Sequence, residues 1–279
     1  MKAMRELETG VESLYSEIFK PALDQVADIL SLDPSSAKQV LTSFYPVLRG
    51  SRFGWRAYSK PMGYAGDYRT IEMIYNPTIS YTDTLSDWAM DKWCLNSSSG
   101  QGVSLRRPYL VQKVRDAVAD AGGEAVNVMS IASGPGAEIS DWVQENYHTC
   151  NPIHFWCVDN DAEALQFAQY RLARSAIMAE IQTLSNAMDV SPPRLSHIQG
   201  QQDPKRPSLC VEGLATFIKA NVLYASRGRA ADPRQHCLPQ QDLIYSSGLI
   251  DYLQAGNIVE AASYTSSPME ATPTCSLWL

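Results

Sequence analysis

Apolar and polar positions follow two different patterns along the chain. Up to about residue 121 the apolar residues recur at helical spacing, which predicts helices over 4–31 (broken at Pro21), 35–48, 70–75, 84–95 and 104–121. From residue 126 onward short apolar runs alternate with helical stretches. They predict strands at 126–132, 153–158, 216–223 and 242–246, with helices at 137–147 and 162–184.

Strands that alternate with helices are typical of a parallel sheet with right-handed crossovers. We therefore expect an α/β fold, with a Rossmann-like parallel sheet preceded by an N-terminal helical cap. Ser104, after a small-residue linker at 96–102, is expected to cap the last helix before the sheet. The expected domains are the helical cap and substrate region over 1–103, the cofactor-binding domain over 104–256 and an irregular tail over 257–279.

Composition narrows the classes of function. The 279 residues have a net charge of −7. Nucleic-acid binding needs Lys and Arg that neutralise the phosphates, so no nucleic-acid partner is expected. No run approaches the roughly 18 apolar residues that span a bilayer, and a secretory signal is not expected from the first residues, so no membrane partner is expected. The six Cys residues form no Cys-x-x-Cys pair, which favours reduced thiols and a cytoplasmic location.

The most specific segment is the glycine turn at 130–136, Ser-Ile-Ala-Ser-Gly-Pro-Gly. It follows the first predicted strand and precedes a helix, so its backbone N–H groups can approach a ligand closely. Asp159 ends the second predicted strand, where a carboxylate can accept hydrogen bonds from ribose hydroxyls. The turn and the carboxylate together predict nucleoside binding.

On these residues the chain resembles class I S-adenosylmethionine-dependent methyltransferases, over about residues 104–256. The resemblance implies S-adenosylmethionine as cofactor. The implied cofactor-binding residues lie in four places. The glycine turn contributes Ser130, Ala132, Ser133, Gly134 and Gly136, and the end of the second strand contributes Asp159 and Asn160. Asn221 and Val222, in the third predicted strand, are expected near the adenine, and Ser246 and Ser247 at the floor of the transfer site. Ser130 and Ala132 depart from the family pattern, which often has an acidic residue and usually a glycine at these positions.

A second segment, Lys60–Tyr68 (Lys-Pro-Met-Gly-Tyr-Ala-Gly-Asp-Tyr), resembles a bacterial-type subgroup linked to the synthesis of a 3-hydroxy fatty acid methyl ester signal. Two tyrosines and a carboxylate between glycines suit a lid over the cofactor. The alternative is a structural turn between two helices. As a lid, it would make Tyr64 and Asp67 the candidate catalytic bases for a hydroxyl acceptor, whereas a carboxylate acceptor needs no base.

The cations near this segment allow one further interpretation. Arg52, Arg56 and Lys60, beside Trp55, could hold an anionic group of the substrate. A solvated face is the favoured interpretation.

The expected function is that of an S-adenosylmethionine-dependent methyltransferase acting on a small molecule, with a carboxylate or hydroxyl as acceptor. An NAD(P)-dependent oxidoreductase is less favoured, because Ile139 stands where the dinucleotide fingerprint has its third glycine. The other alternative is a catalytically inactive or partner-completed cofactor-binding module.

The alternative of an inactive or partner-completed module is based on the tail, residues 257–279. After residue 257 the chain has neither helical nor strand periodicity over a useful length, so the later strands of the family fold are expected to be missing from a truncated chain. The fourth strand would then be an exposed edge. A second copy of the chain or a partner chain would be expected to cover it.

No metal site is expected. His148, Cys150, His154 and Cys157 offer nitrogen and sulfur ligands at short spacing. Alternate side chains of a strand point to opposite faces, however, so His154 and Cys157 are expected to diverge.

Overall fold

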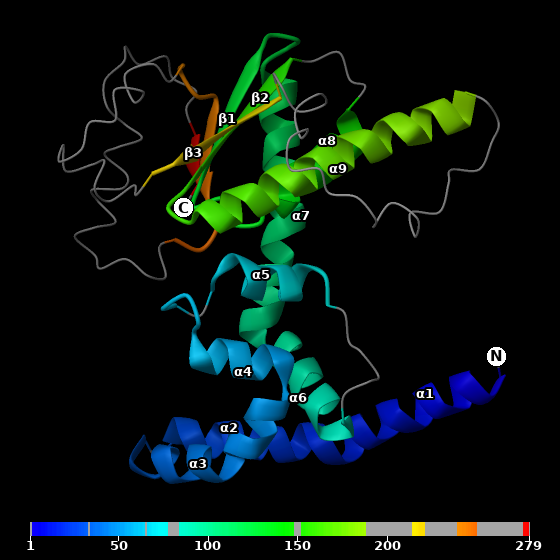
Figure 1. Cartoon of the computed structure of the whole chain (residues 1–279), viewed down its shortest axis with the longest axis vertical. Helices are drawn as coiled ribbons and strands as arrows, with labels where there is room; N and C mark the ends of the chain where they lie inside the picture. Colours follow the sequence, from blue (N-terminus) through cyan, green and yellow to red (C-terminus); the bar gives the residue numbers. More distant parts are fainter. Residues whose placement is uncertain are drawn as a thin grey trace. The chain divides into compact units, whose positions relative to one another are not determined.

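The computed structural model describes residues 2–32, 34–64, 66–77, 84–147, 152–187, 214–220, 239–249 and 276–278. The chain divides into two compact units, Met1–Leu105 (unit 1) and Arg106–Leu279 (unit 2). Figure 1 labels their helices α1–α9 and the strands β1–β3. Among the helices of the described residues, none combines the length and the apolar character that a membrane span needs.

Unit 1 is helical. Its elements are α1 (Lys2–Leu14), the π-helix η1 (Tyr15–Phe19), α2 (Lys20–Leu32), α3 (Pro34–Gly50), α4 (Arg52–Ser59), α5 (Tyr68–Tyr75), α6 (Leu85–Leu95) and the first part of α7 (Ser98–Asp120). The break expected at Pro21 takes the form of η1. Proline has no N–H for the carbonyl four residues earlier, and just before it the N–H of Lys20 bonds to the carbonyl of Tyr15, which gives π-helical spacing.

Two helices of unit 1 begin earlier than expected. α3 starts at Pro34, one residue before the expected start, and proline is suited to the first helical position. α7 starts at Ser98, so the expected linker at 96–102 and the expected cap at Ser104 are wrong. At Gly100 an added Cβ would lie 2.5 Å from the carbonyl oxygen of Leu95, so this glycine allows the start of α7 to approach the end of α6.

Helix α6 supplies the centre of the unit 1 core. On one side Trp88 and Ala89 pack with Tyr15 of η1. On another side Met90 packs with Leu23 of α2 and Leu48 of α3. Leu23 therefore lies in the core, whereas Leu14, Ile18 and Ile29 of the same predicted helical stretch are exposed.

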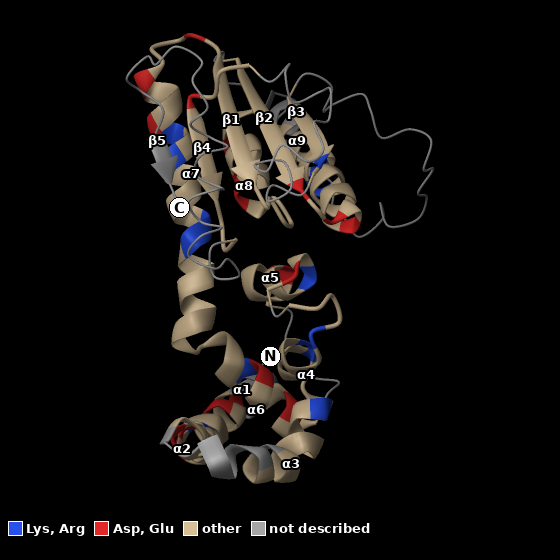
Figure 2. Ribbon diagram, turned by 90° about the vertical axis from the view of Figure 1, so that its left-hand side faces the viewer, with Lys and Arg blue, Asp and Glu red and all other residues tan. Residues whose placement is uncertain are grey.

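Unit 2 contains a parallel sheet. Its strands are β1 (Val126–Ile131), β2 (Ile153–Asp159), β3 (Ala215–Lys219), β4 (Leu243–Ser246) and β5 (Ser276–Trp278). They pair in the order β3-β2-β1-β4-β5, and every pairing is parallel (Figure 2). This is the order of a Rossmann-like, doubly wound sheet, in which the direction of travel across the sheet reverses between β1 and β4.

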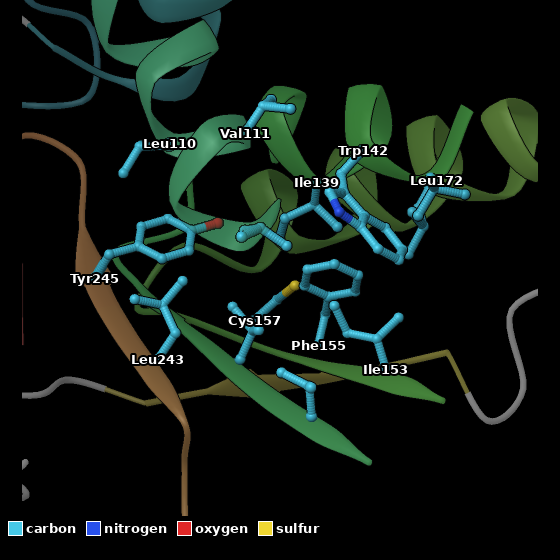
Figure 3. Close-up of a cluster of buried hydrophobic side chains, with 14 of the residues drawn as sticks. Leu110, Val111, Ile139, Trp142, Ile153, Phe155, Cys157, Leu172, Leu243 and Tyr245 are labelled. Atoms are coloured by element: carbon cyan, nitrogen blue, oxygen red, sulfur yellow. The ribbon is translucent and has the colours of Figure 1, made fainter. Parts of the chain in front are cut away.

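Helices α7, α8 (Ala137–Asn146) and α9 (Ala162–Ala187) supply the apolar side chains that pack on one face of the sheet. Figure 3 shows Phe155, Cys157 and Tyr245 of the strands directed toward Ile139 and Trp142 of α8. Strand residues whose side chains point to the opposite face of the sheet form a second buried cluster, which consists of Met129, Ile131, Val158 and Ile244. Because both sets are buried, the strands are near-continuous apolar runs, as parallel sheets require.

The strand β5 was not expected. Residues 257–279 were predicted to be irregular, and β4 was predicted to be an exposed edge. Residues 276–278 instead pair with β4 in parallel, so the expected exposed edge at β4 is wrong. A second copy or a partner chain is therefore not needed to cover that strand.

Candidate functional site

The carboxyl ends of β1, β2 and β4 meet at one edge of the sheet. The residue Ile131 at the end of β1 pairs with Val158 on one side and with Ser246 on the other. Open parallel sheets bind ligands at this edge, where the strand order reverses. In this chain that point lies between β1 and β4, beside the glycine turn at residues 132–136.

The glycine turn has an unusual backbone. Ala132, Gly134 and Gly136 have φ values of 53°, 52° and 57°, in the left-handed region. For Ala132 this conformation costs about 1 kcal/mol. The turn is held by hydrogen bonds from the Ser133 N–H to the carbonyl of Val158 and from the Gly136 N–H to the carbonyl of Ser133, both of 3.1 Å. The backbone is thus fixed in shape before any ligand binds.

The two glycines of the turn have different surroundings. At Gly136 an added Cβ would lie 3.2 Å from the Cβ of Ala168, so this glycine allows α8 to pack closely on α9. At Gly134 the nearest atom to an added Cβ is the carbonyl oxygen of Ala132, at 4.0 Å. Gly134 is therefore the position in the turn where a ligand can approach the backbone.

Asp159 fixes the β2 side of the site. Its carboxylate is 7% exposed and accepts hydrogen bonds from the N–H of Gly134 (2.8 Å, to Oδ2) and of Asp161 (2.9 Å, to Oδ1). Burial raises the pKa of Asp159, and the N–H groups of Asp161 and Gly134 act in the opposite direction. A carboxylate has about four acceptor positions. The N–H of Asn160 also acts on this carboxylate, so at least one acceptor position remains for a ligand hydroxyl.

Three buried side-chain oxygens at this edge lack a hydrogen-bond partner in the described part of the chain. They are Ser133 Oγ in the turn, Asp161 Oδ2 after β2 and Ser246 Oγ at the end of β4. Buried polar groups are nearly always hydrogen-bonded, and an unsatisfied one costs about 1–3 kcal/mol. The edge therefore fits a polar ligand that supplies the missing partners.

A cation lies on the β4 side of the turn. Nη1 of Arg106, in α7, is 2.9 Å from the position that a Cβ would take at Gly248, two residues after β4. The site thus has a positive group on the β4 side and the carboxylates of Asp159 and Asp161 on the β2 side. Arg106 was not among the residues expected from the sequence, because the contact joins residues far apart in the chain and has no local signal.

A buried polar pair lies next to the turn. Glu138, in the first turn of α8, accepts a hydrogen bond of 2.9 Å from the hydroxyl of Tyr245 in β4. Burial raises the pKa of Glu138; burial also raises the pKa of Tyr245 well above its usual range, and the charge of Glu138 adds to that shift. The pair joins the start of α8 to the strand on the far side of the site.

The remaining expected cofactor-binding residues fall in three places. Ser130 is buried inside β1, in register with Tyr245 of β4, and does not belong to the turn itself. Asn160 is exposed and Ser247 half-buried, next to Asp159 and Ser246 respectively. Asn221 and Val222 lie outside the described residues.

The segment Lys60–Tyr68 forms the connection between α4 and α5 in unit 1. Lys60 ends α4 in the left-handed conformation (φ 46°), and the Gly63 N–H donates to its carbonyl at 2.7 Å. Tyr64 is half-buried in this turn. Asp67 caps α5, since its side chain accepts from the N–H groups of Arg69 and Thr70.

Asp67 is fully buried, and both of its carboxylate oxygens accept hydrogen bonds. Its Oδ1 accepts from Arg56 Nη2 at 2.5 Å and its Oδ2 from Thr70 Oγ1 at 3.2 Å. Arg56, an expected candidate for holding an anionic substrate, is thus paired inside the protein. These contacts give Asp67 a structural role, and neither Asp67 nor Tyr64 is proposed as a catalytic base.

The two strand residues of the metal hypothesis face apart. His154 Nε2 lies 2.8 Å from Thr216 Oγ1, and the His154 ring packs on Trp156. Cys157 belongs to the core on the helical face. His148 and Cys150 lie outside the described residues, and within the described ranges no group of three or more His, Cys, Asp or Glu side chains could hold a metal ion.

Comparisons with known proteins give few similarities. No protein-family model matches the chain, and no curated protein sequence matches it. Among solved structures, the chain is similar to a crystal structure described as a possible exported protein from Bordetella parapertussis, with 14% sequence identity and a TM-score of 0.49. The similarity covers 83% of this chain and 59% of that chain. It indicates nothing about ligand or activity.

Proposed function

We propose that unit 2 binds S-adenosylmethionine at the carboxyl ends of β1, β2 and β4, and that the chain is a methyltransferase acting on a small molecule. The main support is that an open glycine turn, the Asp159 carboxylate and three unpartnered buried oxygens occur together where the strand order reverses. The resemblance of residues 130–136 and Asp159 to the motifs of this enzyme class supports the same ligand.

The residues present fit the parts of this cofactor. The free acceptor positions of Asp159 and Asp161 would bind the ribose hydroxyls, and the backbone beside Gly134 would contact the methionine part. Arg106 would hold the carboxylate of that part, since a guanidinium binds carboxylates through paired hydrogen bonds. The bound cofactor supplies an already activated methyl group, so the chain needs mainly to align the acceptor and exclude water.

The packing of Ile139 supports this proposal over dinucleotide binding. The dinucleotide fingerprint has a glycine there, which permits close packing of helix on strand. In this chain Ile139 is 1% exposed and fills the core between α8 and the sheet (Figure 3). A glycine at this position would leave a cavity.

Calorimetric titration tests the proposed ligand. S-adenosylhomocysteine, the stable product of methyl transfer, is expected to bind with a stoichiometry of one per chain, and NAD⁺ is expected not to bind. Binding of NAD⁺ without binding of S-adenosylhomocysteine would contradict the proposal. The acceptor can then be sought by mass spectrometry of cell extract incubated with the protein and an isotopically labelled methyl donor.

The role of Arg106 has its own test. Arg106→Gln should lower the affinity for S-adenosylhomocysteine about tenfold, because a charged hydrogen-bond partner of the ligand carboxylate is lost. The affinity for methylthioadenosine, which lacks the amino-acid part, should stay the same. Arg115→Gln, an exposed position of the same helix whose side chain pairs with Glu145, is the matched control. An equal loss for both ligands in Arg106→Gln would exclude the assigned contact.

A further inference from the structure

An outward-facing set of aromatic and basic side chains lies on α3 and α4 of unit 1. On α3, Tyr45 and Arg49 are four residues apart and share one face. On α4 the stripe at three-residue spacing is Arg52, Trp55 and Tyr58, and Lys60 follows the helix. We refer to these six residues as the α3–α4 surface.

The aromatic rings of this surface contact one another without entering the core. The ring centroids of Tyr45 and Trp55 are 5.4 Å apart, those of Tyr45 and Tyr58 6.0 Å, and those of Trp55 and Tyr58 5.8 Å. Tyr45 is nevertheless 37% exposed and Tyr58 48% exposed. Three adjoining rings that remain partly in water are an amphipathic patch, with apolar ring bodies and polar hydroxyl groups.

The charge of the surface is opposite to that of the whole protein. Residues 34–66 contain five Lys and Arg and no Asp or Glu, in a chain of net charge −7. Arg56 is neutralised by Asp67, but Arg49, Arg52 and Lys60 are exposed and form no ion pair with any described residue. Figure 2 shows the positions of Lys, Arg, Asp and Glu along α3 and α4. Asp87 and Asp91 of α6 lie against Gly50 and Ser51 but are half-buried, and Asp91 accepts hydrogen bonds from Ser51 and Phe53. The exposed charges of the α3–α4 surface itself are therefore positive.

We propose that the α3–α4 surface docks on an anionic lipid bilayer. Tyr and Trp are favoured at the level of lipid headgroups, and Lys and Arg next to them are attracted by acidic headgroups. Met62, which is 41% exposed just after Lys60, adds an apolar side chain to the same region of the chain. Peripheral attachment of this kind needs no spanning helix, and it is independent of the ligand proposed for unit 2.

A single-stranded nucleic acid fits the surface less well. Bases stack on open ring faces. Here Tyr45 stands at 89° to Trp55 and at 84° to Tyr58, so edge-to-face packing between the rings covers part of their faces. The net charge of the chain also opposes a long polyanion.

Sedimentation with lipid vesicles tests the proposal. The whole chain is expected to bind vesicles of phosphatidylcholine mixed with phosphatidylglycerol, to bind pure phosphatidylcholine vesicles weakly, and to be released by salt. Arg52→Glu/Tyr58→Ser is expected to weaken binding about 20-fold, because the charge changes by two units at the surface and one ring is removed. Both positions are exposed, so folding should be retained, which circular dichroism checks.

The matched control changes the same residue types on α9. Tyr170 is 58% exposed and Arg174 is exposed, so Arg174→Glu/Tyr170→Ser alters charge and aromatic content equally. It should bind vesicles as the unaltered chain does. Equal loss in the control, equal binding to both kinds of vesicle, or displacement from vesicles by a single-stranded oligonucleotide at matched charge concentration would overturn the proposal. If the first double variant unfolds, Arg49→Gln, with an expected loss of about fivefold, replaces it.

Discussion

Two segments of this chain combine glycines with a buried aspartate, and their surroundings differ. In the α4–α5 connection Asp67 is fully buried, is paired with Arg56 and caps α5. At the edge of the sheet Asp159 holds the turn around Gly134, but the nearby Asp161 Oδ2 and two serine hydroxyls have no partner among the described residues. The first segment is complete without a ligand, whereas the second is not.

This difference shows how to separate a structural glycine motif from a binding one. Both segments have residue types that suit a ligand site, and residue type alone does not distinguish them. Buried polar atoms do, because a native protein satisfies nearly all of them internally or with a bound molecule. The comparison predicts that changes at Asp67 act on stability and that changes at Asp159 act on binding.

The largest effect on stability is expected for Asp67→Ala. It removes the partner of Arg56 and the cap of α5, so the free energy of unfolding should fall by about 3 kcal/mol. Asp67→Asn, which keeps an acceptor for the N–H groups of Arg69 and Thr70, should lose less. Urea unfolding of the three proteins measures this. Unchanged stability together with abolished methyl transfer in Asp67→Ala would show that Asp67 has a functional role and would contradict its assignment as a structural residue.

The glycines of the turn should separate stability from binding within one segment. Alanine at either position must adopt a left-handed conformation, at a cost of about 1 kcal/mol. In Gly136→Ala the added Cβ also lies 3.2 Å from the Cβ of Ala168, so the free energy of unfolding should fall by about 2 kcal/mol in total. Gly134→Ala should lose less stability but more affinity for S-adenosylhomocysteine. Thermal unfolding and calorimetry on both variants check the order, and the opposite order would contradict the separate roles of the two glycines.

A smaller effect, which depends on pH, is expected for Glu138→Gln. Burial raises the pKa of Glu138 in the folded chain above its unfolded value. Its contribution to stability is therefore full below the unfolded pKa and is lost as pH rises through the folded pKa. Glutamine still accepts from Tyr245 and does not titrate, so the variant should gain stability relative to the original chain as pH rises.

Urea unfolding from acid to neutral pH measures this difference. Glu124→Gln, an exposed position before β1, is the matched control for removal of a carboxylate. A difference between Glu138→Gln and the original chain that does not change with pH would show that Glu138 does not titrate in this way.

Local sequence patterns predicted much of the fold. The apolar runs placed β1, β2 and β4 within about a residue, because buried parallel strands are continuous apolar segments. The start of α7 was missed because Gly100 looks like a linker residue, although it serves a close approach to Leu95. The strand β5 was missed because a strand of three residues is too short to show a period in the sequence. It forms by pairing with β4, which is distant in the sequence.

The candidate site was predicted less completely. The turn and Asp159 have local signatures, since a glycine at a strand end and a carboxylate at the next strand end are visible in the sequence. Arg106 and Glu138 have none, because their contacts with Gly248 and Tyr245 exist only in the folded chain. The burial of Asp67 was equally invisible, since a carboxylate between glycines suits both a lid and a helix cap.

The most direct test of the proposed cofactor site is a calorimetric titration of S-adenosylhomocysteine into the unaltered chain and into Asp159→Ala, with folding verified for both. We predict that the unaltered chain binds and that the variant binds at least about a hundredfold more weakly, because the charged acceptor for the ribose and the hydrogen bond that holds Gly134 are both lost. Unchanged affinity in a folded Asp159→Ala variant would contradict the proposed cofactor site.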